Sequence, residues 1–571
     1  MQTAAKKQNI IWLVLFALSF ALMLWKLPYG FGGDDEGFYL TLANRLCMGE
    51  RLFSDEWHLS QLSSFFTYPL VFLFRKFNGT NEGILLFSRC VYLLCHSAAS
   101  AVVYLRLRKY GAGAILASLF FILFTPFDMM TVSYNTIALD TLALAGVFAC
   151  TGAMLPSGIF FACAVVCCPY LAAVYLLYFI VSLLYKLLRK KTGKEFFSFP
   201  LFTLKNFFRF SIGIAVVLAL FMLFFFSHCG VKELIRNLPG IFSDPEHPTY
   251  SLFFKLKRYV YCILTCHPCA WLPIGLYVLT LAALFFDRGR KKRILFYMLL
   301  SSASAVLWFC LFLPKLTENY YNAIMLPLTL VGFSAYILLK NRPRELFVGI
   351  FLPGILYSIC VCATSNMGFT ILSIAFSVVN MASLIFIILL IRENRVEKSA
   401  KALSAACLAP VALLGALILT VKVNHCFWDA SPSKLDAEIT LGPAKGIVTN
   451  EYFRWSYETI CRDMSSYADK SGNILVYSQQ AWSYLIPENM HWASFSAWLS
   501  GLDEATNERL RLYYELNPDK APDCIYIPKT SAFGDCLLTS EDINSAAEKY
   551  GFSVEENAIS YKLDKLPDIT A

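Results

Sequence analysis

Charged residues are scarce in this chain. Of its 571 residues, 16% are Asp, Glu, Lys or Arg, whereas 57% are hydrophobic and Phe alone contributes 49. A soluble globular chain carries nearer a quarter of charged residues. This deficit excludes an ordinary water-soluble enzyme as a description of the whole chain. It predicts a protein with many membrane-spanning segments.

Several signals of familiar sites are missing as well. The sequence contains no tandem repeat, no low-complexity linker and no glycine-rich loop of the kind that cradles nucleotide phosphates. No C-x-x-C motif pairs with a second one, and the single motif that ends at Cys269 favours packing at a membrane edge over a zinc site. Most of the 19 cysteines lie in apolar runs, where a thiol acts as a small hydrophobe. Four cysteines of the tail would pair only in an oxidising compartment: Cys426, Cys461, Cys524 and Cys536.

The charges that do occur are unevenly spread. From residue 424 to the end there are 12 Lys and Arg against 22 Asp and Glu, whereas residues 1–423 hold 37 basic and 18 acidic residues. A basic membrane part therefore precedes an acidic, water-soluble tail. Basic loops on the cytoplasmic side of a membrane explain the overall charge of +9, so the charge is no sign of nucleic-acid binding.

Apolar runs predict about thirteen transmembrane helices. The first covers residues 10–27, and we interpret it as retained, because the chain that follows has no small-residue cleavage site. The other spans are expected at 84–105, 112–125, 134–151, 157–170, 172–188, 210–228, 269–286, 294–313, 321–339, 345–363, 369–391 and 403–421. Basic clusters follow the even-numbered spans, which predicts that residues 1–423 form a bundle with two long outer loops, at about 28–83 and 229–268. The same count places the tail outside the cell, on a multi-pass protein of the plasma membrane.

The tail, residues 424–571, is expected to form a small extracytoplasmic α/β domain. "NILVYSQQ" and "DCIYIPK" have the composition of short strands, and "DEATNERLRLYYEL" between them has the pattern of a helix. The predicted fold class is therefore an α-helical polytopic membrane protein with a C-terminal α/β domain. The tail shows no nucleophile triad and no metal-ligand spacing, so we expect it to recognise an acceptor or to cover the site.

Three consecutive carboxylates begin the first outer loop, in "GGDDEGFY", residues 32–39. One interpretation is a solvated loop that merely separates two segments. Against it, the glycines before Asp34 allow a tight turn, and the following residues continue as an amphipathic helix with Phe38, Leu42 and Leu46 on one face. An acid held rigidly and partly desolvated at the start of an interfacial helix suits a general base.

The same residues carry a resemblance. "GDDEGFYLTLANRL" followed by "GERLF" resembles the first-loop signature of the GT-C membrane glycosyltransferases, in the branch of the protein O-mannosyltransferases and the lipid A aminoarabinose transferase. Asp35, Glu36 and Tyr39 match that pattern position by position, and Asp34 is an additional acid. The resemblance implies transfer of a sugar from a polyprenyl-phosphate donor to a glycan, lipid or protein acceptor, with inversion. It further implies that Asp35 deprotonates the acceptor and that Glu36 orients the acceptor or helps to bind it. We expect Asp34 and Tyr39 to bind substrate.

Such a reaction also needs positive charge for the departing lipid phosphate. "LPKLTENYYNAIMLPL" resembles the family's segment that meets the phosphate, with Lys315, Tyr320 and Tyr321 in the corresponding places, although the spacing is looser. A lysine that extends to the membrane interface is the alternative for Lys315. Further candidates are Arg258 and Lys255 in the second long outer loop, because basic residues expected on the outer side could meet anionic lipid. An ordinary solvated loop is the alternative for both.

Polar residues before the interfacial helix complete the candidate site. His58 and Gln61 precede an apolar, proline-interrupted stretch that suits a helix lying at the membrane surface, and both are expected to contact substrate. No cofactor is certain, but a divalent metal bound by Glu56 or His58 with His228, His247 or His267 is possible in principle. A transporter or flippase of lipid-linked sugars is the alternative function. It would favour internally repeated halves, which the sequence lacks.

Overall fold

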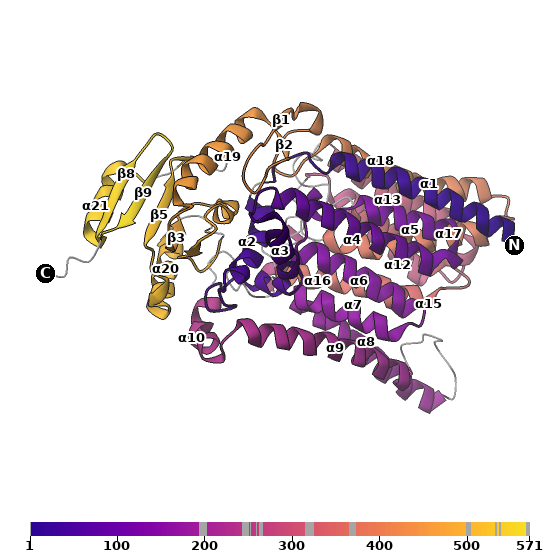
Figure 1. The fold of residues 1–571 in the computed structure, drawn as a ribbon. Coiled ribbons are helices and arrows are strands. Elements are labelled where there is room, and N and C mark those ends of the chain that lie inside the picture. The colour runs from indigo at the N-terminus through magenta and orange to yellow at the C-terminus, as the bar shows by residue number, and fades with distance from the viewer. Residues whose placement is uncertain are drawn as a thin grey trace.

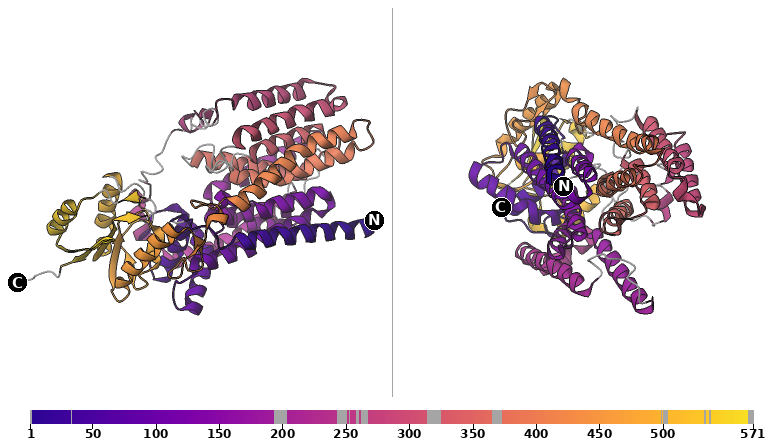
Figure 2. Two further views of the ribbon diagram at one scale, coloured as in Figure 1. Left: turned by 90° about the horizontal axis from the view of Figure 1, so that it is seen from above. Right: turned by 90° about the vertical axis from the view of Figure 1, so that its right-hand side faces the viewer.

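The computed structural model describes residues 2–566 except for 33, 193–202, 243–250, 252, 258–259, 262–266, 314–324, 365–372, 498, 500–503, 532–533 and 536–537. Long helices run side by side and form an elongated bundle, and a smaller domain with strands lies beyond one end of it (Figure 1). Seen from above, that domain still lies beyond the same end, so the two views agree on this arrangement (Figure 2).

The bundle confirms the predicted number of apolar helices. Within the part of the chain that the structure describes, eight helices are long and apolar enough to cross a membrane, and five shorter apolar helices accompany them. In chain order the helices are α1 (Gln2–Lys26), α4 (Ile84–Leu107), α5 (Ala112–Leu123), α6 (Tyr134–Cys150), α7 (Met154–Cys167), α8 (Ala172–Thr192), α9 (Leu204–His228), α12 (Trp271–Phe286), α13 (Ile294–Phe312), α14 (Met325–Leu338), α15 (Arg344–Leu346) continuing through η9 (Phe347–Phe351) into α16 (Leu352–Thr364), α17 (Ser373–Glu393) and α18 (Ala400–Asn424). The fold is that of a polytopic α-helical membrane protein.

Side-chain exposure supports the same conclusion. Large apolar side chains such as Leu223 and Phe286 are 71% and 87% exposed on the outside of the bundle. A soluble domain buries such residues, whereas lipid solvates them. Inside the bundle, an apolar core runs through α5, α14, α17 and α18, with Ile385 and Leu414 fully buried.

Short helices cover the end of the bundle that faces the C-terminal domain. They are α2 (Asp34–Cys47), the 3-10 turn η1 (Leu59–Ser63), α3 (Ser64–Asn78) and α10 (Val231–Ile241) (Figure 1). The helix α3 occupies the place of the expected interfacial helix and continues beyond Pro69 to a left-handed cap at Gly79. It exposes Phe72 and Phe77 and carries Arg75 in its last turn, a pattern typical of helices at a membrane surface.

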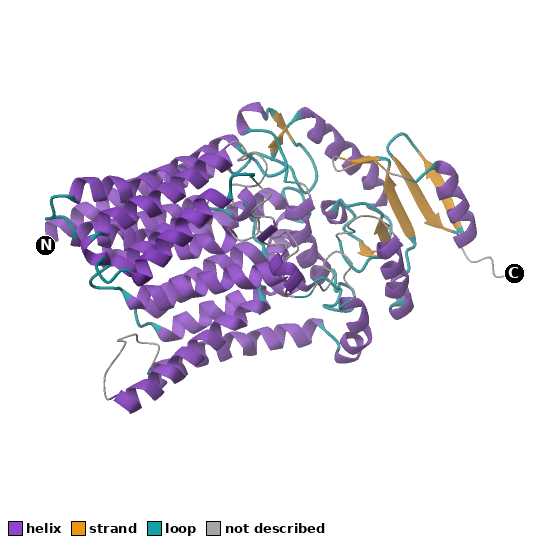
Figure 3. Ribbon diagram, turned by 180° about the vertical axis from the view of Figure 1, so that it is seen from behind, coloured by secondary structure: helices purple, strands orange, loops and turns teal. Residues whose placement is uncertain are grey.

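The C-terminal domain is built on a five-stranded sheet in the order β4-β3-β5-β9-β8. These strands are β3 (Gly472–Val476), β4 (Met490–Trp492), β5 (Cys524–Pro528), β8 (Phe552–Glu556) and β9 (Ser560–Lys565), and the small pairs are β1 (Ala437–Glu438) with β2 (Val448–Thr449) and β6 (Thr530–Ser531) with β7 (Gly534–Asp535). The strand β3 runs parallel to β4 and β5, and β9 runs antiparallel to β5 and β8. The helices are α19 (Glu451–Met464), η13 (Ala481–Leu485), α20 (Glu504–Leu516) and α21 (Ser540–Tyr550). The described strands lie at one end of the molecule (Figure 3).

Basic loops gather at the opposite end of the bundle. There the Gln8 side chain of α1 donates to the carbonyl of Arg108, and the Tyr110 hydroxyl donates to Glu345 at 2.7 Å. The first contact brings the loop after α4 next to α1. The second contact joins the same loop to α15, which follows α14. The loops after α4 and α14 thus lie at the end of the bundle opposite the C-terminal domain (Figure 1).

Candidate functional site

The three acids begin the helix α2, which is enclosed between the bundle and the C-terminal domain. Acidic side chains in a first turn interact favourably with the positive end of the helix dipole. Every residue from Glu36 to Leu46 is buried, and Asp35 is half-buried. The sequence predicted an amphipathic interfacial helix, and the structure differs, because the polar face of α2 is covered as well. Phe38, Leu42 and Leu46 are all buried, as that prediction requires.

Glu36 is bound by a buried arginine that the sequence analysis missed. The Arg89 guanidinium of α4 donates to both Glu36 carboxylate oxygens, from Nε at 3.0 Å and from Nη2 at 2.6 Å. Its remaining donors reach the carbonyls of Leu27, Tyr29 and Gly30 at 2.6–3.2 Å. Both side chains are 5% exposed or less. The pair therefore fixes the start of α2 to α4 and to the chain that leaves α1.

A signal for Arg89 was present in the sequence. It lies five residues into an apolar span, where an unpaired charge is costly and therefore marks a partner inside the bundle. The identity of that partner is not readable from the sequence, because Glu36 is 53 residues away.

Asp35 shares one face of α2 with Tyr39. The two residues are four apart, which places them one above the other on a helix. The Tyr39 ring packs edge-on against Tyr134 of α6 with 5.7 Å between ring centroids. Burial raises the pKa of Tyr39 well above its usual value, and the neighbouring Tyr134 phenol and Asp35 carboxylate raise it further. Tyr39 therefore stays a neutral hydrogen-bonding group beside Asp35.

His58 and Gln61 take different places near this helix. The His58 ring packs edge-on against Phe38 of α2 at 5.1 Å between centroids, and its Nδ1 accepts from the Ser60 amide. Gln61 is buried, and its amide donates to the carbonyls of Glu56 and His58 at 2.9 Å while its oxygen accepts from the Phe53 amide. His58 therefore contacts α2, whereas Gln61 stabilises the loop before η1 through hydrogen bonds to its backbone.

Four predicted site residues lie outside the described residues: Arg258, Lys315, Tyr320 and Tyr321. In the described ranges no three His, Cys, Asp or Glu side chains are grouped so that they could hold a metal ion. His247 is again outside those ranges, and Glu56 is occupied by protein donors. Cys426, Cys461 and Cys524 are free thiols.

A second buried charge cluster joins the ends of α1 and α18. Asp128, in the loop between α5 and α6, forms ion pairs with Lys26 of α1 and Lys422 of α18, and His425 lies 3.4 Å from it. A cavity of about 10 Å³, large enough for one water molecule, separates this cluster from the Glu36–Arg89 pair. The sequence analysis did not identify the cluster, because its members are far apart in the chain. It ties α1, which precedes the segment with α2, to α18, which precedes the C-terminal domain.

The C-terminal domain contacts α2 directly through Trp482 of η13. A Cβ built on Gly37 would lie 2.6 Å from the Trp482 Cβ and 2.8 Å from its backbone nitrogen. The Trp482 ring also packs 4.4 Å from Tyr457 of α19, measured between centroids. Only glycine at position 37 allows this backbone approach.

We therefore expect Gly37→Ala to separate η13 from α2. Because the clash is with backbone and Cβ atoms, no side-chain rotation relieves it, and the expected cost is about 1–3 kcal/mol. The measurement is the midpoint of thermal unfolding of the purified protein. Gly275→Ala on α12 is the matched control, because nothing lies within 4 Å of its added Cβ. Equal midpoints for the two variants would contradict the proposed contact.

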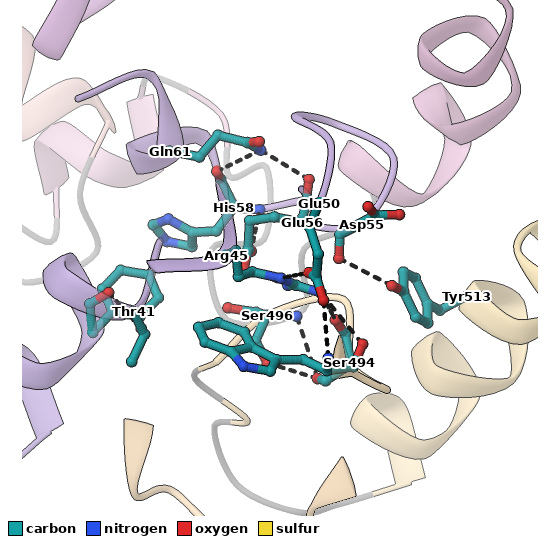
Figure 4. A network of polar contacts seen from close by, with 12 residues as sticks. Thr41, Arg45, Glu50, Asp55, Glu56, His58, Gln61, Ser494, Ser496 and Tyr513 are labelled. Carbon is teal, nitrogen blue, oxygen red and sulfur yellow. Dashed lines mark hydrogen bonds and ion pairs between the residues drawn. The ribbon is translucent and has the colours of Figure 1, made fainter. Parts of the chain in front are cut away.

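Arg45 connects α2 to the C-terminal domain through a second network (Figure 4). Its guanidinium pairs with Glu50 and with Glu56, the latter at 3.0 Å. It also donates to the carbonyl of Ser494 at 3.0 Å, and Glu50 accepts from the Trp492 amide at 3.0 Å. All three charged side chains are 4% exposed or less. One arginine therefore joins the end of α2, the following loop and the strand β4.

The two carboxylates on Arg45 have opposite pKa shifts. Burial raises the pKa of Glu50, but Arg45, His491 and Lys520 outweigh that effect and lower the pKa to about 2. Burial raises the pKa of Glu56 to about 7, although Arg45 and the His58 amide oppose it. One guanidinium thus holds Glu50 ionised and leaves Glu56 close to its protonation midpoint at neutral pH.

This difference predicts how stability changes with pH. The folded pKa of Glu56 lies above its unfolded value. The stability that the folded protein gains from a protonated Glu56 is therefore fully present below about pH 4 and is lost as the pH rises through 7. We expect Glu56→Gln to flatten the fall in thermal midpoint between pH 5 and pH 8. Glu50→Gln, the matched variant, should instead lower the midpoint at neutral pH, because it removes the ionised partner of Arg45. A wild-type slope retained in Glu56→Gln would contradict the assignment.

No family model matches the chain, and no curated protein sequence matches it. Among solved structures, the chain is similar to the crystal structure of ArnT from Cupriavidus metallidurans bound to undecaprenyl phosphate. The identity is 11% and the TM-score 0.40, over 98% of this chain and 99% of that chain. A likeness of this level does not assign the chain to a family.

Proposed function

We propose that this protein is a membrane glycosyltransferase that moves a sugar from a polyprenyl-phosphate donor to an acceptor on the outer face of the plasma membrane. The observation that carries the proposal is the placement of Asp35, a half-buried carboxylate in the first turn of an enclosed helix. Arg89 binds the neighbouring Glu36, so the backbone at the start of α2, which carries Asp35, is held in place. A rigid, partly desolvated carboxylate meets the requirements of a general base.

The location of α2 suits a lipid-linked donor. It lies at the end of the apolar bundle, beside α3 and next to the C-terminal domain (Figure 1). The phosphate of a polyprenyl donor lies at the membrane edge while its chain stays in the hydrocarbon, so a site at this level reaches the sugar. The basic loops at the opposite end of the bundle support an outer location for α2 and for the C-terminal domain.

The proposed reaction is a single displacement at the anomeric carbon. Asp35 accepts the proton of the acceptor hydroxyl, whose oxygen forms a bond to the anomeric carbon as the bond from that carbon to the phosphate oxygen breaks. The polyprenyl phosphate leaves with the electron pair, and attack from the opposite side inverts the configuration. Arg258, Lys315, Tyr320 and Tyr321 remain our candidates for binding the phosphate, Asp34 and Tyr39 for binding substrate, and His58 for the acceptor side. Glu36 acts by positioning α2, and Gln61 by bracing the loop of His58.

The direct test is mass spectrometry of cell-envelope glycans and lipid-linked sugars in cells with and without the protein. The proposal expects one sugar to disappear from the envelope and its polyprenyl-phosphate carrier to accumulate on the outer leaflet. Accumulation of the carrier on the inner leaflet would instead identify a flippase. Unchanged glycans together with unchanged carriers would contradict both functions.

A further inference from the structure

The C-terminal domain contains a cavity of about 620 Å³ that the site described above does not use. It lies over one face of the five-stranded sheet, between α20 and α21. Leu475 of β3, Ile525 of β5 and Leu563 of β9 form its floor, and Leu510 and Ala546 of the two helices form its walls. In Figure 1 these helices flank the sheet, at the end of the molecule away from the bundle.

The cavity exists because two helices leave the centre of the sheet uncovered. On β5, Cys524 and Tyr526 pack into the core that also contains residues of α19, so Ile525 and Ile527 point to the opposite face. Ile525 is half-buried although it belongs to a central strand of the sheet. A volume of about 620 Å³ with mostly apolar walls falls in the range of sites that bind small molecules.

The charges at the cavity point to the kind of ligand. Arg511 of α20 and Lys565 of β9 both line it, in a domain with 12 basic and 22 acidic residues. Within the described ranges neither side chain forms an ion pair, whereas seven other basic residues of the domain do: Lys445, Arg454, Arg462, Lys470, Lys520, Lys529 and Lys562. Two exposed cations without an ion pair therefore lie beside an apolar cavity.

The acidic residue at the cavity does not supply the missing partner. The Asp542 carboxylate accepts from the Thr539 amide at 3.0 Å and from the Thr539 hydroxyl at 2.6 Å, so it caps α21. The polar groups opposite it are also engaged, since the Tyr477 hydroxyl donates to Asn507 at 3.0 Å. Arg511 and Lys565 therefore remain available for an anion that comes from outside the domain.

We propose that this cavity binds a small amphiphilic anion, with an apolar body over Ile525 and Leu563 and one carboxylate or phosphate between Arg511 and Lys565. The apolar body replaces water on the half-buried Ile525, and the two cations determine the sign of the head group. The ligand reaches the cavity from water, because the C-terminal domain extends away from the bundle (Figure 1). The inference is independent of the proposed transferase activity.

The test uses the full-length protein in nanodiscs of phosphatidylcholine and the fluorescent probe 1-anilinonaphthalene-8-sulfonate, an aromatic anion. After subtraction of the signal from empty nanodiscs, we expect one saturable site per chain. Decanoate should displace the probe, and decylamine, with the same chain length and the opposite charge, should not. Equal displacement by the two competitors, or no saturable signal, would overturn the proposal.

Variants locate the binding to this cavity. Ala546→Trp should abolish probe binding, because the new side chain fills the space between α20 and α21. The double variant R511A/K565A should weaken binding tenfold or more through the lost charge alone, and Lys549→Ala, which removes an exposed cation of α21 outside the cavity, should change nothing. Circular dichroism checks that each variant folds, and R511A/K565A carries the test if Ala546→Trp does not fold. Unchanged binding in the double variant would overturn the proposal. The proposal would also fail if a second copy of the protein covered the cavity and kept the probe out.

Discussion

Asp35→Asn should reduce sugar transfer by about 10²- to 10⁴-fold, the range that a general base contributes. The substitution keeps the size and the polar character of the side chain and removes its ability to accept a proton. Binding of the lipid donor should be retained, since other residues are proposed to bind its phosphate. The loss should therefore fall on the rate at saturating donor rather than on the donor concentration required. Transfer is measured with a radiolabelled or fluorescent lipid-linked sugar in reconstituted protein.

Asp34→Asn provides the matched control for this prediction. It removes the same charge from the same turn of α2, one residue earlier, and therefore causes the same change in the helix-dipole interaction. We expect a smaller loss, because the role proposed for Asp34 is substrate binding. Full activity of Asp35→Asn, or equal losses in the two variants, would remove Asp35 from the role of base.

Arg89→Met should cause the largest loss of folded protein among single substitutions at the site. It leaves the Glu36 carboxylate, which is 2% exposed, without its charged partner. Removing one member of a buried ion pair costs about 3–5 kcal/mol, because the remaining charge stays out of water. It also frees three backbone carbonyls that the guanidinium binds. The measurements are the yield of monodisperse protein and the midpoint of thermal unfolding.

The double variant R89M/E36Q separates the charge effect from simple loss of packing. If the unpaired carboxylate causes the damage, the neutral glutamine should recover part of the midpoint that Arg89→Met loses. Glu36→Gln alone should be less destabilising than Arg89→Met, because an arginine that keeps its contacts to three backbone carbonyls is less isolated than a buried carboxylate. A double variant no better than Arg89→Met would show that the ion pair is not the source of the stability.

The apolar runs of the sequence were sufficient to predict the bundle. Each run of about twenty apolar residues has one stable conformation in a membrane, a helix that satisfies its own backbone hydrogen bonds. For that reason the thirteen predicted spans match the apolar helices of the described chain closely, from α1 to α18. The strands β3 and β5 and the helix α20 were likewise expected, because their patterns are local.

The surroundings of the three acids were not predictable in the same way. The amphipathic pattern of α2 indicated one buried face, and nothing in it distinguished a polar face turned to water from one covered by a domain some 440 residues later. Arg45 illustrates the difference, because its carbonyl partner at Ser494 is 449 residues away. Arg89 and Asp128 are similar cases, since each has its partners on distant helices.

The sequence by itself determined the apolar helices, the acidic character of the final domain and the position of Asp35 just after the first apolar helix. These follow from periodicity, composition and order along the chain, which are local properties. Only the tertiary structure decided that Glu36 is bound by Arg89, that Arg45 is shared by Glu50 and Glu56, and that Trp482 lies against Gly37. Such pairings depend on which segments pack together in three dimensions, and the free energy that selects them is shared among residues hundreds of positions apart.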